Sequence, residues 1–158
     1  MAALDSAILH GWRGAPLFRR LHRYALLMRM NRPIGIGLLL WPTLWALWIA
    51  ARGLPDGGGM PPTKLLWVFI AGTIVMRSAG CVINDYADRN IDPFVRRTRG
   101  RPLAQRLVSP QEALGLFAVL VLLALWLVTR LDWKTVQFAF IGAALTISYP
   151  FKIGRAHV

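Results

Sequence analysis

The stretch Pro33–Ala51, PIGIGLLLWPTLWALWIAA, contains 19 consecutive residues without a charge. A helix needs about 20 mainly apolar residues to cross the hydrocarbon core of a bilayer. We therefore predict that this stretch is a membrane-spanning helix. Pro42 lies inside it, and membrane helices tolerate such a residue because their neighbours can satisfy the freed carbonyl.

Three further apolar stretches follow, at Leu65 to about Tyr86, at Ala113–Thr129 and at Trp133–Phe151. The last is weaker because Lys134 falls in its first turn, from which its amine can reach the interface. The 158 residues are 56% hydrophobic and only 16% charged, whereas soluble domains carry about 25% charged residues. The sequence thus predicts an all-α fold, a polytopic membrane helix bundle with about four transmembrane helices.

Basic residues account for the net charge of +12. They are concentrated in two segments, one before the first predicted span and one between the second and the third. Because positive loops stay on the cytoplasmic side, we expect a multi-pass inner (plasma) membrane protein with a cytoplasmic N-terminus and a cytoplasmic second loop. Nucleic acid is an unsuitable partner, since the basic loops are short and lack interleaved aromatic residues. The single cysteine, Cys81, excludes an internal disulfide framework. The segments hold Arg13, Arg19, Arg20, Arg23, Arg29 and Arg32, and Arg89, Arg96, Arg97, Arg99, Arg101 and Arg106.

Residues 1–32 form a basic segment in which apolar residues recur at helical spacing opposite the arginines. We expect this segment to be amphipathic and to lie flat on an anionic inner leaflet. A frayed basic tail is the alternative. The apolar residues are Leu17, Phe18, Leu21, Tyr24, Ala25 and Met28.

Three of the seven acidic residues lie within the string Asn84–Asp92, NDYADRNID. At about 100° per residue, Asp85, Asp88 and Asp92 would fall within about 60° on one helix face. Such carboxylates repel one another unless a positive group lies between them. Mg²⁺ suits this position, because it is usually held by one or two carboxylates together with phosphate oxygens. A solvated helix face is the alternative interpretation.

Arginines accompany these carboxylates on both sides. Arg77 lies inside the predicted second span, where a charged residue indicates a functional role. Four more arginines, between Arg96 and Arg101, could bind phosphate bidentately, although the positive-inside rule alone could also explain them. Carboxylates for Mg²⁺ beside arginines for phosphate together predict a diphosphate ligand.

The string Asn84–Asp92 resembles the N-D-x-x-D-x-x-x-D motif of the UbiA superfamily of intramembrane aromatic prenyltransferases, and Val95–Leu103 resembles its V-x-R-T-x-x-R-P-L continuation. Arg32–Gly35, running into Leu40–Trp48, resembles the branch that prenylates 4-hydroxybenzoate in ubiquinone synthesis. Ser148–Phe151 is similar to the start of the family's S-Y-P-F-M-K-R stretch. The resemblance implies a nine-helix fold with a second aspartate motif, of which residues 33–151 would be the N-terminal half.

The resemblance implies that the full-length protein transfers a polyprenyl group from polyprenyl diphosphate to the ring of 4-hydroxybenzoate, in a lipid bilayer and with Mg²⁺. It further implies that this half alone is inactive. Dihydroxynaphthoate, homogentisate, a chlorophyllide or haem are alternative acceptors, and a transporter or channel fragment is an alternative class. In this interpretation the metal ligands are Asp85, Asp88 and Asp92, supported by Asn84, and the substrate-binding residues are Arg97 and Arg101 for diphosphate, Arg32 or Arg29 for the acceptor carboxylate, and Arg77.

Two expectations concern the ends of this segment. The family pattern stops after Phe151, and Ile153–Val158 matches the translation of a common sequencing adapter, so residues 152–158 are expected to be a non-native tail. Four helices would also leave the polar face with Arg77, Asn84 and Asp85 without partner helices. Water or lipid headgroups should then cover that face.

Overall fold

The computed structural model describes residues 16–53 and 59–152, with side chains described for 17–53 and 59–145. This part of the chain contains α-helices and one short 3₁₀-helix but no strand. The all-α prediction is therefore confirmed. The elements are α2 (Pro16–Leu27), α3 (Ile34–Arg52), α4 (Thr63–Ala87), η1 (Asp92–Phe94), α5 (Pro110–Val128) and α6 (Trp133–Lys152). The tail predicted at 152–158 lies, apart from its first residue, outside the described residues.

Three of the described helices, α3, α4 and α5, are long and apolar enough to cross a membrane. They coincide with the first three predicted spans. α6 forms over the fourth predicted range but is not among these three, and it carries Lys134 and Gln137 in its first two turns. The described residues thus form a polytopic helical bundle.

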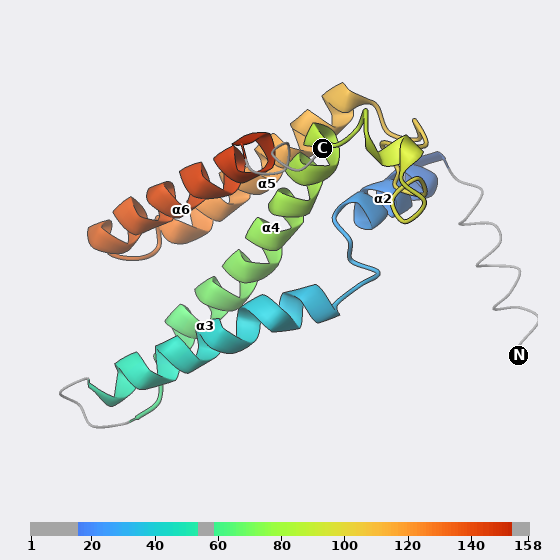
Figure 1. The fold of residues 1–158 in the computed structure, drawn as a ribbon. Helices are drawn as coiled ribbons and strands as arrows, with labels where there is room; N and C mark the ends of the chain where they lie inside the picture. Colours follow the sequence, from blue (N-terminus) through green and yellow to red (C-terminus); the bar gives the residue numbers. More distant parts are fainter. Residues whose placement is uncertain (1–15, 54–58, 153–158) are drawn as a thin grey trace, which may run out of the picture.

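α4 is the central helix of the bundle (Figure 1). It contacts α2, α3, α5 and α6, and its contact with α5 is the most extensive. One end of α4 reaches α2 and the connection to α5, and the other end lies beside α3 (Figure 1). The other four described α-helices therefore all pack against α4.

Helix α2 packs against the start of α5. Leu27 is fully buried in the main apolar core together with residues of α4, the following loop and α5. Arg23 donates to the carbonyl of Leu107 at 3.1 Å, and the Tyr24 hydroxyl lies 3.3 Å from Glu112 Oε1. Residues 16–27 are therefore not frayed, and residues 1–15 lie outside the described part. The buried core residues are Leu27, Ala79, Val82, Leu103, Val108, Ala113 and Leu120.

The apolar face predicted for residues 1–32 is partly exposed and partly packed against the core. Leu17, Phe18 and Leu21 are exposed, whereas Tyr24 and Met28 pack against the core. Only the first half of the face is thus available to a membrane surface. That α2 lies on the inner leaflet stays a prediction.

The start of α5 is fixed by local sequence. The Ser109 hydroxyl accepts from the backbone N–H of Glu112, and the Glu112 carboxylate accepts from the N–H of Ser109. This reciprocal capping box, with Pro110 in the first helical position, satisfies N–H groups that a helix start leaves unpaired. It ends the loop that carries the arginines at a defined place.

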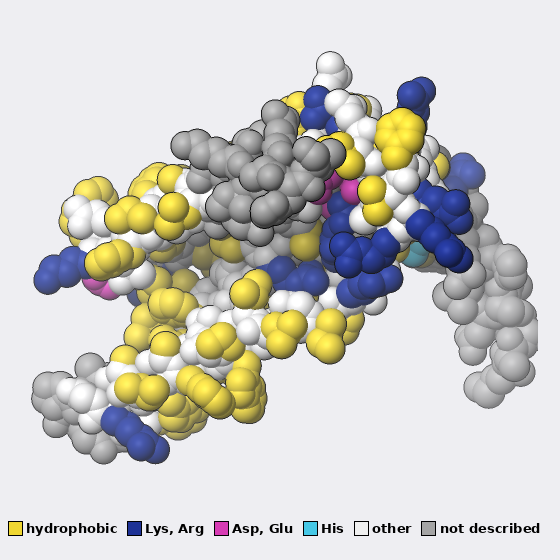
Figure 2. All heavy atoms as spheres, viewed as in Figure 1, with side chains coloured by type: hydrophobic (Ala, Val, Ile, Leu, Met, Phe, Trp, Pro, Cys, Tyr) yellow, Lys and Arg dark blue, Asp and Glu magenta, His cyan; other side chains and the backbone are white. Residues whose placement is uncertain are grey.

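The outer surface of the bundle separates apolar from basic side chains. Figure 2 shows apolar side chains along α3 and basic ones gathered towards α2 and the α4–α5 connection. On α3, only Ala51 is buried, while Ile34 and Leu38 are more than 70% exposed. A soluble protein does not expose such a face, so the surface suits lipid.

Candidate functional site

Asp85 lies in the last turn of α4 and is the most deeply buried acidic residue described, with 1% of its surface exposed. Its Oδ1 atom lies 2.9 Å from a guanidinium nitrogen of Arg29 and 3.1 Å from one of Arg101. Two arginines from distant segments thus neutralise one buried carboxylate. Removing one partner of a buried pair usually costs about 3–5 kcal/mol, because the other charge is left uncompensated.

Arg101 connects all three predicted aspartates. One of its guanidinium nitrogens lies 3.1 Å from Asp85 Oδ1, 2.8 Å from Asp92 Oδ2 and 3.9 Å from Asp88 Oδ2. The Asn84 amide donates to Asp88 Oδ2 at 3.3 Å, and its support of metal ligands stays a prediction. The carboxylates therefore converge on one positive group, and in this structure that group is a guanidinium.

The route by which the aspartates converge differs from the prediction. They do not share one helix face, because α4 ends at Ala87 and a separate 3₁₀-helix begins at Asp92. Pro93 has no N–H to donate to a continued α-helix, and the chain turns between Asp88 and Ile91 instead. The turn, and not helical periodicity, returns Asp92 to Arg101.

The loop that follows is folded around Thr98. Its hydroxyl lies within hydrogen-bonding distance of the Asp92 carbonyl, at 3.2 Å, and the residue is 7% exposed. This contact holds the loop so that Arg97 and Arg101 border one pocket. Thr98 was not among the predicted site residues, although it is a fixed letter of the family motif V-x-R-T-x-x-R-P-L.

The turn between α2 and α3, residues 28–32, supplies the opposite side of that pocket. The N–H of Met30 donates to Ala25 and the N–H of Arg29 donates to Leu26, the pattern of a Schellman helix end. Arg29 takes the left-handed position with a φ of 55°, where glycine is usual. Burial lowers the pKa of Arg29, but the attraction of Asp85 outweighs this effect and leaves the pKa above its ordinary value.

These segments enclose a pocket of about 390 Å³, called here the arginine pocket. It brings together three of the predicted substrate-binding arginines, Arg32, Arg97 and Arg101, with Arg29. Four guanidinium groups beside one buried carboxylate favour an anionic ligand. The lining residues are Leu26, Arg29, Asn31, Arg32, Asp85, Arg97, Thr98, Gly100, Arg101 and Pro102.

Arg77, the predicted arginine inside the membrane span, does not line the arginine pocket. Its guanidinium donates to the carbonyls of Met28 and Arg32, at 3.4 and 3.2 Å. The polar face of α4 was expected to be covered by water or headgroups. In the structure the 28–32 turn contacts Arg77 and Asp85 on this face, and no buried side-chain polar atom among the described residues lacks a partner.

Asp85, Asp88 and Asp92 are the donors that a metal ion at this site would use. Among the described residues, no three or more His, Cys, Asp or Glu side chains are arranged to hold a metal ion. Asp85, Asp88 and Asp92 have the oxygen donors that Mg²⁺ prefers, and they surround a single position for a cation. Because Arg101 occupies that position, these carboxylates fit Mg²⁺ only where Arg101 moves to another anion.

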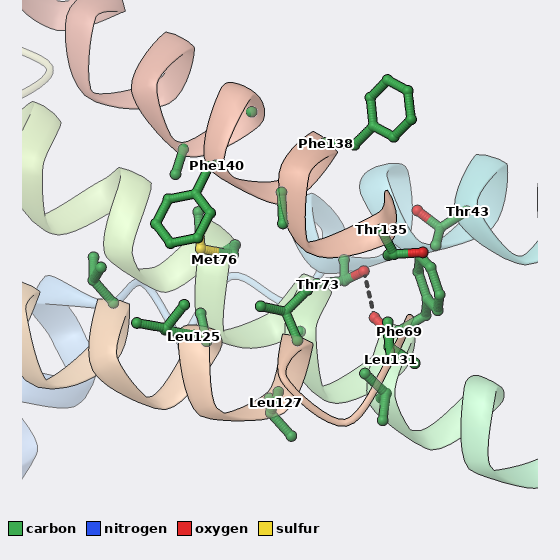
Figure 3. Close-up of a pocket in the computed structure, with 18 residues that line it drawn as sticks. Thr43, Phe69, Thr73, Met76, Leu125, Leu127, Leu131, Thr135, Phe138 and Phe140 are labelled. Carbon is green, nitrogen blue, oxygen red and sulfur yellow. Dashed lines mark hydrogen bonds between the residues drawn. The ribbon is translucent and has the colours of Figure 1, made fainter. Parts of the chain in front are cut away.

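A second cavity, of about 550 Å³, lies between α3, α4, α5 and α6 and is called here the apolar cavity. Figure 3 shows Phe69, Met76, Leu125 and Phe140 around it. The Thr73 hydroxyl lies beside it, but it donates to the Phe69 carbonyl at 2.7 Å and so is already satisfied (Figure 3). This cavity suits a hydrocarbon ligand, unlike the arginine pocket.

The fold and this site define a multi-pass helical membrane protein with an arginine-lined pocket at one end of its bundle. Residues 39–158 match the model of the UbiA prenyltransferase family. The chain belongs to the UbiA prenyltransferase family.

The relatives carry one recurring name. The chain is 58% identical over 139 residues to the 4-hydroxybenzoate octaprenyltransferase of Nitrosococcus oceani. These residues make up 88% of this chain and 47% of the relative. The enzyme of the same name from Coxiella burnetii is 52% identical over 142 residues, which make up 90% of this chain and 47% of that relative. The enzyme of this name from Ectopseudomonas mendocina is 56% identical over 125 residues, which make up 79% of this chain and 40% of that relative. This chain spans about half the length of the curated relatives it matches, and no solved structure matches it.

Proposed function

We propose that the whole protein transfers a polyprenyl group from polyprenyl diphosphate to the ring of 4-hydroxybenzoate. The observation that carries the proposal is the arginine pocket, in which four arginines lie beside the buried carboxylate of Asp85 at one end of a membrane bundle. Both substrates are anions, a diphosphate and a carboxylate. The names of the relatives favour 4-hydroxybenzoate over the other aromatic acceptors.

Within the pocket the arginines divide into two groups. Arg97 and Arg101 belong to the loop after α4, and we assign the diphosphate to them. Arg29 and Arg32 belong to the 28–32 turn and are assigned to the acceptor carboxylate. Two anions held on opposite sides would bring the allylic carbon and the aromatic ring together, and positioning of this kind supplies much of the rate in two-substrate reactions.

The reaction is an electrophilic aromatic substitution. The bond between the allylic carbon and the diphosphate oxygen breaks, and both electrons leave with the diphosphate, whose growing charge the arginines offset. The ring carbon beside the acceptor hydroxyl forms the new carbon–carbon bond, and the proton on that carbon then passes to the released diphosphate, which restores the aromatic ring. Mg²⁺ bound by Asp85, Asp88 and Asp92 would supply further charge compensation for the leaving group.

The bundle supplies the surroundings that a cation-like carbon needs. Water would quench such a carbon, and lipid-facing helices exclude water. The polyprenyl chain requires apolar surface, which the apolar cavity provides among α3 to α6. We place the protein in the inner membrane with the arginine pocket on the cytoplasmic side. The positive-inside rule supports this orientation, since both basic segments lie at one end of the bundle.

The deciding experiment uses the chain completed to the length of its relatives, in membranes with labelled polyprenyl diphosphate. Prenylated 4-hydroxybenzoate is expected, with much less product from dihydroxynaphthoate or homogentisate. Chelation of Mg²⁺ should abolish the product, and the 158 residues alone should give none. Efficient prenylation of another acceptor, or no product from any aromatic acid, would reject the proposed function.

Orientation has its own measurement. A reporter that fluoresces only in the cytoplasm should be bright when inserted at Gly100 and dark at Gly59. The two positions lie in the α4–α5 and α3–α4 connections respectively. The opposite result would place the arginine pocket outside the cytoplasm.

A further inference from the structure

The contact between Arg77 and the 28–32 turn is the feature that the proposed reaction does not use. Two nitrogens of one guanidinium donate to two backbone carbonyls, those of Met28 and Arg32, at the two ends of the turn. A planar guanidinium can hold two acceptors in a fixed geometry, which a lysine amine cannot do. The turn is therefore tied to α4 at both ends by one side chain.

Gly35 makes this contact possible. A Cβ atom at Gly35 would lie 2.7 Å from Nε and 2.9 Å from Cζ of Arg77, closer than Cβ atoms are found to other groups. The guanidinium thus fills the space that the missing side chain leaves on α3. At Gly37, two residues later on the same helix, an added Cβ atom would have no other atom within 4 Å. The close approach is specific to Gly35.

The turn has a conformation that needs such support. Arg29 occupies the left-handed position of the Schellman helix end, which costs a residue with a side chain about 1 kcal/mol relative to glycine. From that position its guanidinium reaches Asp85 at 2.9 Å. A glycine would satisfy the backbone but not Asp85, so the conformation serves the side chain of Arg29.

We propose that Arg77 is a positioning residue: with Gly35 it fixes the 28–32 turn so that Arg29 and Arg32 form one wall of the arginine pocket. This inference rests on the proposed function only for what that wall binds, which is the aromatic carboxylate. Arg77 acts through the backbone and touches neither substrate. Its loss therefore weakens the binding of one substrate and leaves the diphosphate side of the pocket intact.

The first test needs no substrate. Trypsin is added to the purified 158-residue chain in detergent, and mass spectrometry follows the fragment that begins at Met30. Arg77→Met and Gly35→Ala should each speed cleavage after Arg29 about ten-fold, the effect of about 1.4 kcal/mol on an opening equilibrium. Gly37→Ala is the matched control and should leave the rate unchanged, and Arg77→Lys should lie between the two.

Cleavage of a second, distant peptide bond distinguishes a positioning role of Arg77 from a general effect on the stability of the fold. Arg130 is exposed in the turn after α5, far from the 28–32 turn, so the rate of cleavage after it reports loosening elsewhere in the molecule. That rate should not change in any variant. Unchanged cleavage after Arg29 in both Arg77→Met and Gly35→Ala would overturn the inference. So would equal acceleration at both bonds, because Arg77 would then support the fold as a whole.

The second test asks which substrate Arg29 and Arg32 bind, and it uses the chain completed to the length of its relatives. Arg77→Met and Gly35→Ala should raise the KM for 4-hydroxybenzoate about ten-fold and keep the KM for polyprenyl diphosphate within about two-fold. A change in kcat alone, or an equal change in both KM values, would contradict the assignment. Absence of turnover in the unaltered protein would reject the proposed function instead, and the cleavage experiment would still decide the role of Arg77.

Discussion

The arginine pocket and the apolar cavity both border α4, but they are built in different ways. The arginine pocket joins three segments of the sequence, and ion pairs hold two of its arginines, Arg29 and Arg101, to the same carboxylate of Asp85. The apolar cavity lies between faces of four helices and is lined mainly by apolar side chains. The charged end should therefore be sensitive to single substitutions, and the apolar end should tolerate them.

Asp85→Ala should have the largest effect, because it leaves Arg29 and Arg101 without their shared buried partner. The free energy of unfolding should fall by about 3–5 kcal/mol. Activity of the completed chain should be lost, while insertion of the helices survives, since the apolar spans are unchanged. Unfolding in mixed detergent micelles, followed by tryptophan fluorescence, measures the first effect. Stability equal to that of the unaltered protein would show that the pairing contributes nothing.

Asp88→Ala is the comparison within the same cluster. The Asp88 side chain is 32% exposed and lies 3.9 Å from Arg101, so its removal should cost less than about 1 kcal/mol of stability. Activity should nevertheless be lost if Asp88 binds Mg²⁺. The measurement pairs the same unfolding assay with prenyl transfer. Near-normal turnover would remove Asp88 from the mechanism, and a stability loss as large as that of Asp85→Ala would erase the distinction between them.

Substitution of Gly72 tests the apolar end. Gly72 lines the apolar cavity, and a Cβ added there has no atom within 4 Å. Gly72→Leu should therefore fold normally and leave binding of inorganic diphosphate unchanged, while it shortens the polyprenyl chain that the completed enzyme accepts. Gly115→Leu, at an exposed site on α5 with equally open space, is the control. Loss of diphosphate binding in Gly72→Leu would show that the two cavities are coupled.

The helices could be predicted from the sequence because bilayer thickness sets their length and charges mark their ends. Pro33–Ala51 was predicted and α3 spans Ile34–Arg52. The family motif also indicated which aspartates and arginines would meet. Helical periodicity explained the aspartate cluster wrongly, since a turn before Pro93 and the position of Arg101 bring it together.

The role of Arg77 could not be predicted for a physical reason. Its partners are the backbone carbonyls of Met28 and Arg32, and every residue has a carbonyl, so no pattern marks them. The left-handed conformation of Arg29 is equally hidden, because neither glycine nor asparagine occupies the position. Gly35 is the one sequence feature that could have indicated the close approach of Arg77, but glycine is common in membrane helices for other reasons.

The smallest effect is expected at Asp132, which caps α6 outside both cavities. Its carboxylate accepts from the Thr135 hydroxyl at 2.6 Å and from the Thr135 N–H at 3.2 Å, and these hydrogen bonds hold the pKa of Asp132 below its usual value. Because the folded pKa lies below the unfolded one, the stabilisation is complete above the unfolded pKa of about 3.9 and is lost as pH falls through the folded pKa. In Asp132→Asn this part of the pH dependence should disappear, with little change at pH 7, where an amide oxygen still accepts one hydrogen bond. Thermal melts between pH 3 and pH 7 measure it, and identical pH profiles for the two proteins would show that the α6 cap does not contribute to stability.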